Sequence, residues 1–182
     1  MDPSDEEIVA STRRWIERAV IGLRLCPFAA DPFDQGRIRY CVSRALTADE
    51  LVADLDVELR RLRGADPAEC ETTLLIHPDV LGDFFEFNDF LDLVDATLDA
   101  LDLADDIQVA SFHPLYQFAQ TAQDDVENCT NRSPYPTLHL LRQASVERAV
   151  AAFGDTDRIY EGNIATLRGL GADGWRRLWS DD

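Results

Sequence analysis

The stretch ASFHPLYQFAQTAQDDVENCTNRSPYPTLHLL, residues 110–141, determines how the sheet of this 182-residue chain is connected. Its ends belong to two segments typical of buried strands, IQVASFHP (residues 107–114) and TLHLLR (residues 137–142). Its interior is rich in Asp, Asn, Gln and Thr, and loops longer than about 12–15 residues are uncommon unless they are functional or disordered. Tyr116 and Phe118 disfavour disorder, so we expect an ordered loop from which the second strand returns antiparallel to the first.

One alternative for this stretch stays open. Pro114 is suited to the first turn of a helix, and PLYQFAQTAQDD (residues 114–125) would then form a helical crossover. The strand at residues 137–142 would in that case start at the opposite edge of the sheet.

The rest of the chain alternates helices and strands. Capping boxes at Ser4 and Thr47 mark the starts of two helices. Pro27 and Gly64 mark the ends of those helices. Strands separated by helices favour parallel pairing through right-handed crossovers. We therefore expect a single α/β domain over residues 1–182, small and layered, with helices packed on a mixed, mostly parallel sheet of about four strands. A ferredoxin-like α+β arrangement is the alternative. The two other strands are expected at RIRYCVS (residues 37–43) and TTLLIHP (residues 72–78).

The composition excludes several classes of function. The formal net charge is −18, and all seventeen basic residues are arginine. A surface this acidic repels phosphate backbones, so we expect no nucleic-acid partner. The lack of lysine excludes a Schiff base and a P-loop. No apolar run approaches the ~20 residues that span a bilayer, and the acidic start of the chain does not match a signal peptide. We expect a cytoplasmic protein without a membrane partner.

Three histidines are the first candidates for chemistry. His77 and His113 each end an expected strand and precede a proline. If these two strands are parallel, both histidines lie at one edge of the sheet, where open α/β sheets place their ligands. His139 stands near the start of the next strand, which begins at the same edge if it returns antiparallel. The three side chains would then converge under residues 115–136.

Each histidine also has a structural interpretation. A His-Pro pair at the end of a strand is often only a turn, and a histidine in an apolar strand is often a core residue bonded to a backbone carbonyl. The structural interpretation is the stronger one for any single histidine. The spacing of His77, His113 and His139 matches no zinc signature, so the pattern indicates a metal site only weakly. A divalent metal bound by all three histidines is one alternative for the cofactor.

The same region contains candidate ligands for an anion. Arg132 is flanked by Asn131 and Ser133, and Tyr135 follows between two prolines. A guanidinium held in this way suits a carboxylate or a phosphate, which it can bind bidentately. Arg142 ends the last strand just before a helix, which is also a favourable place for an anion. The alternative for Arg132 is a structural salt bridge.

The four cysteines form no C-x-x-C pair and are expected to be free thiols. Cys26 has apolar neighbours, which favour a buried thiol, whereas Cys129 lies in the polar stretch and is expected to be better exposed. A nucleophilic cysteine needs a depressed pKa and a histidine base within reach. A thiol-dependent enzyme that uses Cys26 or Cys129 is therefore one hypothesis for the function.

Several strings in the sequence resemble a family of uncharacterised bacterial proteins, domain of unknown function 1415. The similarity runs from about Trp15 to at least Val150. It implies a bacterial protein with a single domain, but it implies no reaction, cofactor or catalytic residue. The strings are LCPFA (residues 25–29), LLIHP (residues 74–78), NDFL (residues 88–91), QVASFHP (residues 108–114) and NRSPYPTLHLLR (residues 131–142).

The leading hypothesis is an enzyme that acts on a small anionic metabolite by hydrolysis or group transfer. His113 would be the general base or a metal ligand, with His77 and His139 beside it and Arg132 as the substrate clamp. The alternative is a non-catalytic module that binds a protein or a small ligand through the aromatic residues of the polar stretch, such as Tyr116.

Overall fold

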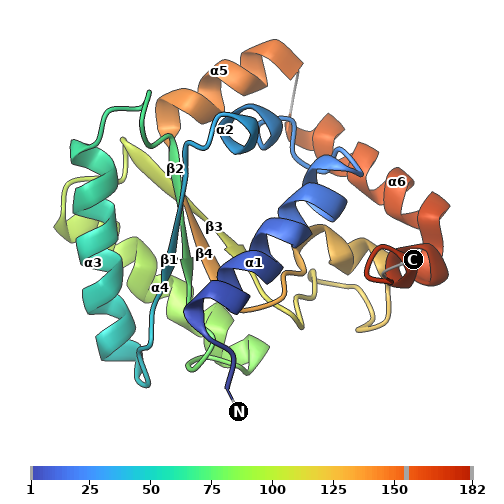
Figure 1. The fold of residues 1–182 in the computed structure, drawn as a ribbon, viewed down its shortest axis with the longest axis horizontal. Helices are drawn as coiled ribbons and strands as arrows, with labels where there is room; N and C mark the ends of the chain where they lie inside the picture. Colours follow the sequence, from blue (N-terminus) through green and yellow to red (C-terminus); the bar gives the residue numbers. More distant parts are fainter. Residues whose placement is uncertain (1, 154–155, 181–182) are drawn as a thin grey trace.

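The computed structural model describes residues 2–153 and 156–180 and contains one four-stranded sheet. The strands lie in the order β1–β2–β4–β3 (Figure 1). β1 and β2 are parallel, and β4 lies antiparallel between β2 and β3. The mixed α/β fold predicted from the sequence is therefore confirmed. The strands are β1 (Ile38–Val42), β2 (Thr72–Ile76), β3 (Ile107–Phe112) and β4 (Thr137–Arg142).

The connections between the strands explain this order. β1 leads to β2 through α3 (Ala48–Gly64), and β2 leads to β3 through α4 (Phe84–Ala100). Residues 113–136 contain only a short 3₁₀-helix, η2 (Val126–Asn131), so β4 can return directly beside β3. The helical crossover from Pro114 is therefore wrong. The parallel neighbours β1 and β2 also exclude the ferredoxin-like alternative.

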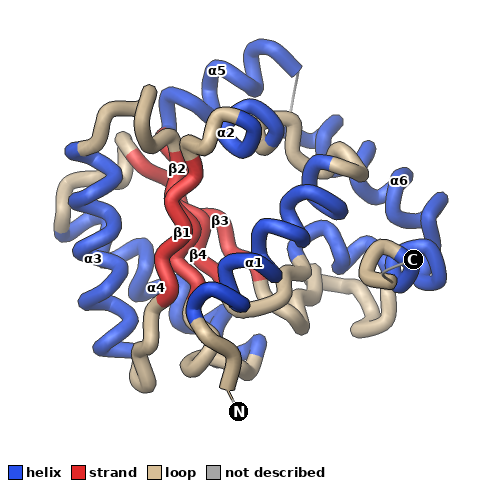
Figure 2. The backbone as a smooth tube through the Cα atoms, viewed as in Figure 1, coloured by secondary structure: helices blue, strands red, loops and turns tan. Residues whose placement is uncertain are grey.

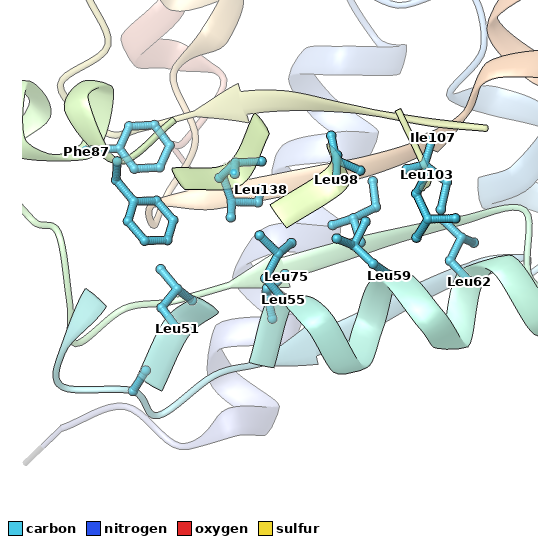
Figure 3. Close-up of a cluster of buried hydrophobic side chains, with 14 residues drawn as sticks. Leu51, Leu55, Leu59, Leu62, Leu75, Phe87, Leu98, Leu103, Ile107 and Leu138 are labelled. Atoms are coloured by element: carbon cyan, nitrogen blue, oxygen red, sulfur yellow. The ribbon is translucent and has the colours of Figure 1, made fainter. Parts of the chain in front are cut away.

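One face of the sheet is closed by α3 and α4. The capping box at Thr47 and Glu50 starts α3, as the sequence predicts. Its leucines at spacings of three and four residues are fully buried against β2, β4 and α4 (Figure 3). Each buried leucine contributes about 1.5–3 kcal/mol, so this face holds the main core. The leucines are Leu51, Leu55, Leu59 and Leu62.

The other face is covered by several helical segments (Figure 2). α1 (Asp5–Trp15) continues directly into a π-helix, η1 (Ile16–Ile21). In and after η1, backbone N–H groups bond the carbonyl five residues earlier, as from Gly22 to Glu17. α2 (Ala30–Asp34) and α5 (Gln143–Phe153) complete this layer.

The last helix, α6 (Thr156–Arg177), packs against η2 and kinks at Gly171, where φ is 68°. Buried Leu25, Cys129 and Leu167 join these segments in a small cluster. Within residues 2–153 and 156–180, no helix combines the length and the apolar character needed to cross a membrane.

Candidate ligand-binding cavity

Alternation along the strands separates the three histidines. Leu138 and Leu140 of β4 face the core under α3 and α4, so His139 between them faces α1. His77 and His113 follow β2 and β3 on the α4 side, where both rings pack on Phe87 at centroid distances of 5.6 and 5.1 Å. The structure thus brings two histidines together and places the third on the opposite face.

The two histidines beside Phe87 are held by backbone groups. The Nδ1 of His77 donates to the Val80 carbonyl, and the Nε2 of His113 donates to the Leu81 carbonyl, each at 3.1 Å. The Leu115 N–H donates to the Nδ1 of His113 at 3.0 Å. The acceptor role of Nδ1 makes the His113 ring neutral, and burial lowers its pKa. Burial lowers the pKa of His77 to about 4, so this ring is neutral near pH 7 as well. Both rings support the turn before α4.

The three-histidine metal site expected from the sequence is not assembled. In the described part of the chain, no three His, Cys, Asp or Glu side chains are grouped to hold a metal ion. The physical reason is the two-residue period of a strand, which sends His139 to the face opposite His77 and His113.

Arg132 does not face a ligand site either. Its Nε donates to the Tyr116 carbonyl at 3.2 Å and its Nη2 to the Gln123 carbonyl at 2.6 Å. The guanidinium therefore links two earlier points of the polar stretch to Arg132. Cys129 in the same stretch is only 5% exposed, so the expectation of an exposed thiol is wrong.

The other predicted anion ligands in this stretch bond nearby carbonyls. The Asn131 side chain donates to the Ser111 carbonyl at 3.2 Å, and the Ser133 hydroxyl donates to the Tyr135 carbonyl at 2.6 Å. Tyr135 packs with the apolar cluster under α1. These residues fix the path of the chain between β3 and β4.

A cavity of about 390 Å³ lies on the α1 face of the sheet. It is bounded by α1 and η1, the turn at residues 26–32, the sheet and α5. Its walls are mostly apolar, and Trp15 meets Phe112 edge to face there at 5.2 Å. The volume falls in the range of small-molecule sites. None of residues 113–136, which are all described, lines this cavity.

The π-helix contributes directly to the wall of the cavity. Ile16 and Val20 of η1 line it together with Trp15 at the end of α1. π-helical turns in proteins occur frequently at functional sites. The sequence gives no signal for this irregularity, because the apolar pattern there also fits an ordinary α-helix.

His139 stands on the floor of the cavity. Its Nε2 lies 2.8 Å from the Thr72 hydroxyl, which itself donates to the Leu140 carbonyl at 2.6 Å. The ring is half-buried and lines the cavity. Burial lowers its pKa to about 4, so the ring is neutral near pH 7.

One end of the cavity is charged. Arg37 bonds Glu71 at 3.1 Å and also pairs with Asp31. Arg148 lies 3.5 Å from Glu71, and Ser145 bonds both of these side chains. This network ties the start of α5 to β2.

Arg142 belongs to the same end but is bonded differently. Its Nη2 donates to the carbonyls of Ala65 and Cys70 at 2.8 and 3.0 Å. Its Nε is buried without a partner, and no carboxylate of the described residues pairs with it. Arg142 therefore borders the cavity, but its guanidinium is held at the end of α3 by these two carbonyls.

Cys26 lines the cavity as well. Burial raises the pKa of its thiol, and the backbone N–H groups of Phe28 and Ala29 at the sulfur lower it less. The thiol is therefore protonated near neutral pH.

The family model for a protein of unknown function, DUF1415, matches residues 7–177. The chain belongs to the DUF1415 family. The match covers almost the whole described chain, including every element that bounds the cavity, and confirms the family resemblance seen in the sequence. No curated protein matches the chain, and no solved structure does. The DUF1415 description assigns no activity, so the chemistry of the cavity has to be argued from its residues.

Proposed function

We propose that this DUF1415 protein binds a small, mostly apolar molecule with an acidic group in the cavity beside His139. The observation that carries the proposal is the combination of apolar walls with two arginines, Arg37 and Arg148, at one end of the cavity. Apolar sites with a few placed polar groups are typical of small-molecule binding.

The charges at this end of the cavity favour an anion. The guanidinium groups of Arg37 and Arg148 lie there beside the carboxylates of Asp31 and Glu71. The Arg148 side chain is 66% exposed, so its guanidinium is accessible to a ligand. The adjacent start of α5 adds the partial positive charge of a helix N-terminus. A carboxylate or a phosphate on the ligand would bind to Arg148 and to the start of α5.

An enzyme that acts on such a ligand by hydrolysis or group transfer is the second candidate. The observation in its favour is a neutral His139 in the cavity, which could accept a proton. A base with a pKa of about 4 is weak at neutral pH, however, so binding comes first. His77 and His113 have no part in this proposal, because they lie outside the cavity and donate to carbonyls.

The test uses a fluorescent apolar anion, 1-anilinonaphthalene-8-sulfonate, with decanoate as its competitor. Val146→Trp fills the cavity from α5, whereas Val150→Trp makes the same change one turn later, outside the lining. We expect one saturable site in the wild type and in Val150→Trp, and an affinity at least tenfold lower in Val146→Trp. Equal affinities in the two variants would overturn the proposal.

A further inference from the structure

We infer that the molecule bound in the cavity carries a hydrogen-bond donor, a hydroxyl or an N–H group, which the Nδ1 atom of His139 accepts. The ligand class is then an apolar acid with a hydroxyl or N–H group on its body. This inference rests on the proposed function and adds the second polar feature of the ligand.

The protons at His139 can be counted from its neighbours. The Thr72 hydroxyl has a single proton, and the Leu140 carbonyl at 2.6 Å can only accept it. The Thr72 oxygen is left as an acceptor toward the Nε2 of His139 at 2.8 Å. Nε2 must therefore carry the ring proton.

The other ring nitrogen is then an unused acceptor. A neutral imidazole has one N–H group, so Nδ1 carries a lone pair. No group in the described part of the chain donates to Nδ1. Because the half-buried ring borders the cavity, a ligand in the cavity is the partner within reach.

Because the pKa of His139 is low, the ring stays neutral at physiological pH, with the proton on Nε2 and the lone pair on Nδ1. A protonated ring would turn Nδ1 into a donor and would favour ligands with an acceptor at this position. Burial disfavours the charged ring, and the cavity acids Asp31 and Glu71 are already paired with arginines. A ligand that excludes water from Nδ1 without donating a hydrogen bond to it leaves a buried acceptor unsatisfied. Such a ligand should bind about tenfold more weakly than one that donates to Nδ1.

The experiment compares 2-naphthoate with its monohydroxylated isomers, each displacing 1-anilinonaphthalene-8-sulfonate. The isomers differ from one another only in the ring position of the hydroxyl group. We expect at least one isomer to bind the wild type about tenfold more tightly than 2-naphthoate, and His139→Phe to abolish that gain while still binding 2-naphthoate. A gain that survives in His139→Phe, or no gain with any isomer, would overturn the inference.

A second measurement does not depend on the variant. Nitrogen NMR of the histidine side chains reports which ring atom carries the proton. We expect the Nε2–H form of His139 in the free protein and a change of the Nδ1 signal with the preferred isomer. An Nδ1–H form contradicts the inference even where 2-naphthoate binds. If 2-naphthoate and all its isomers fail to bind, the proposed function itself fails.

Discussion

The two faces of the sheet are built from different helices. α3 and α4 are each 17 residues long and fill their face with large side chains (Figure 3). The opposite face is covered by α1 with its π-helical extension, by the five-residue α2 and by α5. These elements leave the cavity of about 390 Å³ unfilled. The face under α3 and α4 therefore holds the main core, and the face under α1 holds the cavity.

The histidines show what this difference means for chemistry. His77 on the filled face is fully buried, with its Nδ1 bonded to a backbone carbonyl and its Nε2 enclosed in the core without a partner. His139 on the open face keeps one nitrogen free beside the cavity. The same residue type is structural on one face and available to a ligand on the other, and strand alternation alone decides between them.

The largest effect should come from shortening a core side chain on the filled face. Leu55→Ala removes a fully buried side chain from packed surroundings and should lower the free energy of unfolding by about 3–4 kcal/mol. Leu74→Ala, beside the existing cavity, should cost less, about 2 kcal/mol. Urea denaturation of the two variants checks this difference. Equal losses would mean that both faces are packed alike.

The next effect concerns the pH dependence of stability. His77 has a folded pKa of about 4 against an ordinary value of 6.5, so the unfolded chain binds more protons between these limits. Stability should be complete above pH 6.5 and fall by up to about 3 kcal/mol toward pH 4 through this group. His77→Gln should show a shallower fall in the unfolding free energy over the same range. An unchanged slope would contradict the buried, neutral state of His77.

A smaller effect tests the charged end of the cavity. Arg148→Gln removes a partly exposed guanidinium at the cavity and should reduce the preference for decanoate over decanol about tenfold, close to 1.4 kcal/mol. Arg60→Gln, which breaks an exposed pair on α3, serves as the matched control. Displacement titrations with both ligands measure the preference. A preference that survives in Arg148→Gln would place the acidic group elsewhere.

The smallest effect should appear in the reactivity of Cys26. Its raised pKa and its place in the cavity predict slow modification by a maleimide at pH 7, slowed further several-fold by decanoate. Cys129, buried outside the cavity, should be indifferent to decanoate. Mass spectrometry of the labelled protein resolves the two sites. Modification of either cysteine faster than a free thiol would instead support the thiol-dependent enzyme.

The sequence predicts the sheet well because its signals there are local. The long connection between residues 113 and 136 sets the antiparallel return of β4, and proline after His77 and His113 marks two strand ends. The cavity beside His139 is harder to predict. β4 alternates Leu138 and Leu140 with Thr137 and His139, so its pattern places His139 opposite the two leucines, but it does not tell that the histidine side borders a cavity.

The charged end of the cavity could not be predicted from the sequence. Arg37 meets Glu71 across 34 positions, and Ser145 meets Glu71 across 74. No spacing rule connects residues so far apart. Arg142 was selected as an anion ligand because it precedes a helix, and the structure places it in the cavity lining. The apolar periodicity of the first helix does not indicate the π-helix.

The π-helical turn also bears on how such a cavity can arise and vanish in a lineage. The hydrogen bonds of a π-turn enclose one residue more than those of an α-turn, so a deletion of one residue within it can restore a regular α-helix. Loss of one codon at exposed Glu17 would restore a regular helix and reshape the wall formed by Ile16 and Val20. Relatives one residue shorter between Trp15 and Gly22 should therefore share this sheet and differ in what the cavity admits.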